Sequence, residues 1–175
     1  MMRRLRTLAR EDRGSAVIEL ALIAPVLATL IIGVTDVSIA YGRRLELEQA
    51  VQRSIEKVMQ TTGDTTVAGT IKKEAVCQIN GSNADGTCAA GRLTEAEVTV
   101  TYRLECTSAG GAVSNQDSSD ADTFDAFTCP NATDTEARYI MATAVDTYTP
   151  MFKIHFGTGA NGVYDLSATA GVRVK

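Results

Sequence analysis

Residues 13–34 read RGSAVIELALIAPVLATLIIGV, and this stretch decides the fold of the chain. From Ala16 to Val34 a helix would be about 28 Å long at 1.5 Å per residue, close to the roughly 30 Å of a bilayer core. Glu19 lies inside this segment. An acidic side chain there costs roughly 2.5–3.5 kcal/mol near the bilayer centre and less near an end. We therefore predict a membrane-spanning helix in which Glu19 has a function.

Pro25 interrupts the apolar run. Proline removes one backbone hydrogen bond, but a membrane helix tolerates it where neighbouring groups satisfy the freed carbonyl. We expect Pro25 to break the hydrogen-bond ladder locally without ending the span. In an assembled filament, sister helices would supply the neighbouring groups.

The charges differ on the two sides of the apolar run. The first 14 residues hold five arginines against Glu11 and Asp12, whereas the whole chain has a net charge of −4. Arginines beside a span favour its cytoplasmic side, although Arg43 and Arg44 flank the other end. The acidic remainder argues against nucleic-acid binding, which depends on basic surface.

All the cysteines follow the apolar run, as expected if the C-terminal part faces an oxidising compartment. Four cysteines permit three pairings, and free thiols or a metal site are the alternatives. Zinc ligands usually lie two to four residues apart, which no two cysteines here do, so no metal is expected. The order along the chain favours two disulfides that each enclose a turn-rich loop, Cys77–Cys88 and Cys106–Cys129.

A cleavable secretory signal is the main alternative to a retained helix. Its cleavage site would be Ser38-Ile39-Ala40, which leaves Tyr41 as the first residue. The apolar core of a secretory signal runs for about 7–15 residues, and it does not usually contain a glutamate. The length of the apolar run therefore favours a retained anchor.

The motif Gly14-Ser15-Ala16-Val17-Ile18-Glu19, followed by Pro25 and Gly33, resembles the start of TadE-like pseudopilins of tight-adherence (Flp-type) type IV pilus systems. Their usual pattern is Gly-(Ser/Ala)-Ala-x-x-Glu-(Phe/Leu)-Ala-x-x-x-Pro, then a leucine-rich run and a glycine. The resemblance is specific but confined to this segment. Beyond it only the layout is similar.

The resemblance implies that a prepilin peptidase cuts between Gly14 and Ser15. Residues 1–14 would then be a cytoplasmic leader, 15–41 the transmembrane segment, and 42–175 a periplasmic or extracellular domain. The chain would be a minor pilus component that resides in the bacterial inner membrane or is carried into the pilus, with other pilins, pseudopilins and the inner-membrane assembly platform as partners. The cut would expose an α-amine at Ser15, one helical turn from Glu19, which assigns Glu19 to charge pairing during assembly.

Beyond the membrane, helical periodicity predicts that the same helix continues to about Gln60. Asp64 is the predicted N-cap of a second helix with its own apolar face. The apolar face of the long helix comprises Leu47, Val51, Ser54, Ile55 and Val58. That of the second helix comprises Ala68, Ile71, Ala75, Val76 and Ile79.

Alternation of apolar and polar residues then predicts three strands, at 98–106, 137–148 and 165–174. Laid against the N-terminal helix, the strands would bury their apolar face and that of the helix together. The predicted fold is therefore α+β and pilin-like: a long transmembrane and amphipathic helix on a small antiparallel sheet.

Residues 107–131 are predicted to form one long acidic loop between the first two strands. Its aspartates suggest calcium, but their spacing lacks the turn glycine and terminal glutamate of an EF-hand. We interpret the cluster as solvated. The aspartates are Asp117, Asp120, Asp122 and Asp125.

No pattern of residues indicates an enzyme or a cofactor. His155 is the only histidine, and it has no neighbouring carboxylate, serine elbow or second histidine in sequence. Two function classes remain: a cleaved pseudopilin that acts in pilus assembly, and an uncleaved single-pass envelope protein whose disulfide-bonded domain binds a partner. Glu19 discriminates between them, because only a cut chain places a new amine beside it.

Overall fold

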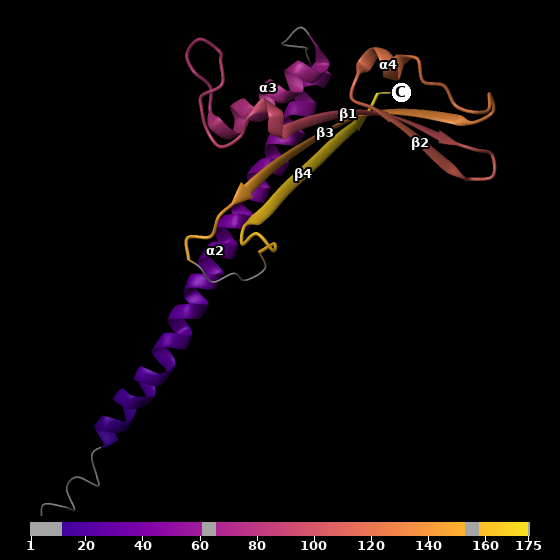
Figure 1. The fold of residues 1–175 in the computed structure, drawn as a ribbon. Coiled ribbons are helices and arrows are strands. Elements are labelled where there is room, and N and C mark those ends of the chain that lie inside the picture. The colour runs from indigo at the N-terminus through magenta and orange to yellow at the C-terminus, as the bar shows by residue number, and fades with distance from the viewer. Residues whose placement is uncertain (1–11, 61–65, 153–157, 175) are drawn as a thin grey trace, which may run out of the picture.

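The structure is a computed structural model that describes residues 12–60, 66–152 and 158–174, with side chains from Ala16 onward. A single helix, α2 (Asp12–Gln60), forms a rod, and the remaining elements gather around its C-terminal half (Figure 1). The N-terminal half of the rod stands clear of the domain. Its C-terminal half lies against the sheet and against α3 (Val67–Asn80).

Helix α2 runs through Pro25 without interruption, so this proline neither ends nor divides the helix. Of the described helices, only α2 is long and apolar enough to cross a membrane. Most of its large apolar side chains from Val17 to Val34 are exposed, at 45–70% of their surface, and Ile32 is half-buried. Such an apolar surface requires a lipid or protein environment, since soluble domains rarely expose it.

The C-terminal half of α2 buries the predicted apolar face. Leu47, Val51 and Ser54 are fully buried, and Val58 packs at the edge of the core. For this half, the interpretation as an amphipathic helix packed on its own domain is confirmed.

Helix α3 packs beside α2, but its N-cap is Thr66 rather than the predicted Asp64, which lies outside the described residues. The Thr66 hydroxyl accepts a hydrogen bond from the Gly69 amide at 2.9 Å. Threonine caps a helix in the same way as aspartate. The helix therefore has a capping residue of the predicted kind two positions later in the sequence than expected.

The sheet has four antiparallel strands, one more than predicted. Their order is β2 (Val113–Ser118), β1 (Val98–Thr107), β3 (Thr135–Tyr148) and β4 (Tyr164–Arg173), and the short 3-10 helix η1 (Glu95–Glu97) precedes β1. The side chains of β1 alternate in burial as predicted. The α+β architecture with a long N-terminal helix is confirmed.

The predicted acidic loop contains an edge strand and a short helix, α4 (Ala121–Asp125). The Arg103 guanidinium pairs with both oxygens of Asp117 across β1 and β2, at 2.7 and 2.8 Å, and this lowers the pKa of Asp117. Asp120 caps α4 by accepting from the Thr123 amide at 2.7 Å. Two of the four aspartates therefore have structural roles.

Two disulfides join Cys77 to Cys88 and Cys106 to Cys129, the pairs that the order along the chain favours. The first closes the turn after α3. The second links the end of β1 to the segment that follows α4. Each disulfide links an irregular segment to a helix or strand. Such links restrict the conformations of the unfolded chain and so stabilise a small domain with a modest core.

Candidate functional site

Glu19 lies near the N-terminal end of α2 with its side chain exposed. No side chain among the described residues contacts it as an ion-pair partner. The backbone of Gly14 and Ser15 belongs to α2, but the Ser15 side chain and residues 1–11 lie outside the described part of the chain.

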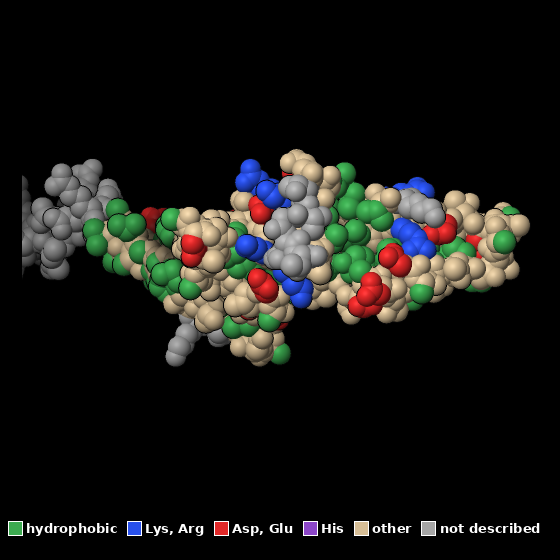
Figure 2. All heavy atoms as spheres, turned by 90° about the horizontal axis from the view of Figure 1, so that it is seen from above, with side chains coloured by type: hydrophobic (Ala, Val, Ile, Leu, Met, Phe, Trp, Pro, Cys, Tyr) green, Lys and Arg blue, Asp and Glu red, His purple; other side chains and the backbone are tan. Residues whose placement is uncertain are grey.

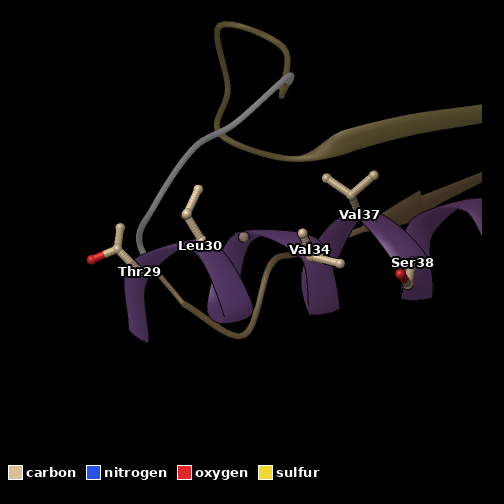
Figure 3. A pocket seen from close by; sticks show the side chains of 6 residues that line it. Thr29, Leu30, Val34, Val37 and Ser38 are labelled. Carbon is tan, nitrogen blue, oxygen red and sulfur yellow. The ribbon is translucent and has the colours of Figure 1, made fainter. Parts of the chain in front are cut away.

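Glu19 shares a helical face with a hollow farther along α2. At 3.6 residues per turn, Leu30 and Val37 lie about three and five turns beyond Glu19 on the same face. In Figure 3 the side chains of Leu30 and Val37 point to the same side of the helix. The hollow has a volume of about 310 Å³, and Gly33 also lines it.

The missing side chain of Gly33 lets another backbone approach α2 closely, as small residues do at helix contacts in membranes. The domain leaves Leu30 and Val37 largely exposed. This face of α2, from Glu19 to Val37, is therefore available to another helix.

Asp36 is the buried acid of α2, with 1% of its surface exposed. It accepts hydrogen bonds from the Tyr148 hydroxyl at 3.0 Å, from the Met151 amide at 2.9 Å and from the Phe152 amide at 3.3 Å. These donors lie at the end of β3 and just after it, more than 110 residues away in sequence. Asp36 thus fastens the β3–β4 connection to the helix.

The other neighbours of Tyr148 reinforce this clamp. The Arg43 guanidinium lies over its ring, 4.7 Å from the ring centroid, and the ring of Tyr164 stacks beside it at 6.0 Å. Burial raises the pKa of Tyr148, and its hydrogen bond to Asp36 raises it further. Tyr148 therefore keeps its proton and donates a hydrogen bond to Oδ1 of Asp36.

Sequence reasoning missed the role of Asp36. The sequence did contain one signal of this role. Asp36 is a second acid that lies just after the apolar run and before the amphipathic part of the helix begins. Its partners could not be found locally, because they belong to another element of the fold.

A second polar group, centred on Arg92, joins the domain to α2. Arg92 pairs with Glu46 of α2 and approaches the buried Asp146 of β3, with 3.4 Å between Nη1 and Oδ2. The Thr147 amide donates to the other oxygen of Asp146 at 2.8 Å. The group lies among packed elements rather than in a cleft, and we assign it to holding the domain on the helix.

The surface seen from above carries intermixed acidic and basic side chains over the domain (Figure 2). Within the described residues, no three His, Cys, Asp or Glu side chains are grouped so that they could hold a metal ion. His155 lies outside the described residues. The features that remain as a candidate site belong to α2: Glu19, the hollow at Gly33 and the Asp36 clamp.

These features define an α+β protein with an N-terminal helix able to cross a membrane. Residues 14–55 match the model of a family described as TadE-like protein, so this segment is similar to the start of that family. The match starts at Gly14 and extends past Asp36 into the half of α2 that packs on the domain. No curated protein and no solved structure matches the chain.

Proposed function

We propose that the chain is a pseudopilin, a minor component that acts in the assembly of a tight-adherence type IV pilus, and that it is not an enzyme. The observation that carries the proposal is the exposed face of α2 from Glu19 to Val37. The domain packs against α2 from Asp36 onward and leaves this apolar face to other helices.

The chemistry of Glu19 follows from cleavage of the leader. A cut after Gly14 creates an α-amine at Ser15, four residues before Glu19, and residues at this spacing are neighbours on a helix. In the low dielectric of a membrane or filament, the carboxylate is stabilised most strongly by pairing with an amine, either that of its own chain or that of an adjacent subunit. Pairing of Glu19 would thereby make insertion of the chain beside another subunit energetically favourable.

The partners follow from this arrangement: a prepilin peptidase on the cytoplasmic side, other pilins and pseudopilins around α2, and the inner-membrane assembly platform. The two disulfides favour a periplasmic position for the domain, because disulfides persist in oxidising compartments. No nucleic-acid partner is proposed for this acidic chain.

The mass of the mature N-terminus tests the proposal. We expect a chain that begins at Ser15 in cells that contain the peptidase, and full-length precursor when Gly14→Leu is introduced, because a side chain then occupies the cut site. Gly42→Leu is the matched control, since an added Cβ at Gly42 meets nothing within 4 Å. A chain that begins at Tyr41 would support a secretory signal instead.

The second candidate function is an uncleaved single-pass envelope protein whose disulfide-bonded domain binds a partner. The two disulfides fit this function equally well. An intact N-terminus in wild-type cells, together with normal pili in a deletion strain, would favour it over the pseudopilin.

A further inference from the structure

The first residues of the β3–β4 connection lie beside α2, at the end of the domain nearest to the free half of the helix (Figure 1). The amides of Met151 and Phe152 donate to Asp36, so the position of these residues along α2 is fixed by hydrogen bonds. Asp36 follows Val34, the last residue of the apolar run, by two residues.

This spacing determines the height of Met151 and Phe152 relative to a membrane. Two residues of helix are about 3 Å along the axis. The polar region on each side of a bilayer is about 5–7 Å thick, from a total of 40–45 Å around a core of 30 Å. If residues 16–34 fill the core, Asp36 and the two amides lie in the headgroup region.

The side chains at this height are apolar and exposed. Met151 has 70% and Phe152 41% of its surface exposed, although both backbones are held against a buried carboxylate. Val34, two residues before Asp36 on α2, is also exposed, at 65%.

We propose that Met151 and Phe152 insert into the headgroup boundary of the same membrane that α2 crosses, and that Asp36 is the positioning residue that holds them there. The occupant of this surface is lipid, because the hydrogen bonds to Asp36 hold Met151 and Phe152 at the depth at which the span ends, and both side chains are apolar and exposed. The domain then touches the membrane at two places, α2 and this loop, which fixes its tilt before extraction into a pilus. The inference rests on the membrane anchoring included in the proposed function.

Nitroxide depth measurements on the full chain test the inference, in nanodiscs of phosphatidylethanolamine and phosphatidylglycerol. The described cysteines are all in disulfides, so the label goes to an introduced Met151→Cys. Leu27→Cys, within the span, and Val113→Cys, exposed at the start of β2, are the deep and aqueous controls. We expect the ratio of collisions with oxygen to collisions with a polar nickel complex to be several-fold higher at Met151 than at Val113, and highest at Leu27.

The outcomes separate this inference from the proposed function. A label at Leu27 that behaves like the one at Val113 would overturn membrane anchoring itself. A deep label at Leu27 with a label at Met151 like that at Val113 would leave anchoring intact and overturn the loop contact. Low collision rates with both reagents at Met151 would indicate a protein contact and also overturn the lipid assignment.

The role of Asp36 needs a separate readout. Asp36→Ala in the Met151→Cys background should shift the label toward the aqueous value, whereas Asp36→Ala in the Leu27→Cys background should leave the depth of that label unchanged. An unchanged Met151 depth would remove Asp36 from the proposal. Should Asp36→Ala fail to fold, Tyr148→Phe, which removes one of the three donors, is expected to give a smaller shift in the same direction.

Discussion

Glu19 and Asp36 lie 17 residues apart on one helix, yet their surroundings are opposite. Glu19 is exposed at the free end of α2, whereas Asp36 is buried and accepts three hydrogen bonds from its own chain. A buried carboxylate is tolerated when donors satisfy it. Asp36 has found its donors within the fold. Among the described residues Glu19 has no ion-pair partner, and our proposal is that it pairs with the α-amine of the cleaved terminus or of another subunit.

The largest expected effect comes from Glu19→Leu. This change removes the cost of placing an acid in the membrane, so we expect stable, inserted protein in normal amounts. Because the charge pair with the α-amine is lost, we expect pili to be lost or strongly reduced. Pilus counts by electron microscopy, together with membrane fractionation, measure the two effects.

Glu48→Leu is a suitable control, since Glu48 is an exposed acid on the same helix that pairs only with Arg44, one turn away. Surface pairs of this kind contribute at most about 1 kcal/mol, so pili should remain. If the Glu19→Leu variant gives wild-type pilus counts, Glu19 does not act through a charge pair in assembly, and the contrast with Asp36 fails.

Loss of a disulfide should affect the domain half and spare the membrane half. Cys106→Ser with Cys129→Ser opens a loop for which the chain-entropy model gives about 3 kcal/mol. We expect the midpoint of denaturant unfolding to fall while insertion and cleavage at Gly14 persist. Unfolding followed by tyrosine fluorescence, and the mature N-terminal mass, are the measurements. Loss of cleavage in this variant would mean that the two halves do not act independently.

Much of this architecture could be predicted because its signals are local. The face formed by Leu47, Val51 and Ser54 and the alternation in β1 each lie within one element, where period alone identifies the buried side. β2 gave no such signal. Its sequence VSNQDS is largely exposed, and it is a strand because it pairs with β1, for example at Arg103 opposite Asp117.

The Asp36 clamp was beyond sequence reasoning for the same physical reason. Its partners come from β3 and the residue pair after it, and no pattern along the chain links them to α2. Glu19, by contrast, was assigned from a motif and from the cost of an acid in an apolar run. A residue whose role is intermolecular can be visible in sequence when its own segment makes it anomalous.

Asp36→Ala sharpens the comparison within the domain. It leaves the Tyr148 hydroxyl without its acceptor in a buried site, and an unsatisfied buried group costs about 1–3 kcal/mol. We expect the domain to lose roughly 2 kcal/mol, with cleavage unchanged. Asp36→Asn keeps a carbonyl acceptor and should lose less. Equal losses for the two variants would show that shape, rather than hydrogen bonding, determines the role of Asp36.

The smallest effect is expected from Tyr148→Phe, about 1 kcal/mol at neutral pH for one hydrogen bond. Its signature is pH dependence. The folded chain raises the pKa of Tyr148 through burial and through Asp36, with Arg43 acting in the opposite direction. The folded state thus holds this proton more tightly than the unfolded state, whose tyrosine titrates near 10. The stability that Tyr148 contributes is therefore fully present below about pH 10 and is lost as pH rises through its raised pKa.

Denaturant unfolding at a series of pH values checks this sign. The difference between wild type and Tyr148→Phe should be constant below about pH 10 and shrink above it. Tyr102→Phe is the matched comparison, because burial also raises the pKa of Tyr102, yet its ring packs against Phe124 and not near Asp36. Double variants that combine Asp36→Ala with each tyrosine variant then show which tyrosine is coupled to Asp36. In the Asp36→Ala background, Tyr148→Phe should cost less unfolding free energy than it does in the wild type, whereas the cost of Tyr102→Phe should be unchanged. Diminution of both would mean that Asp36 acts through the whole domain and not through a local clamp.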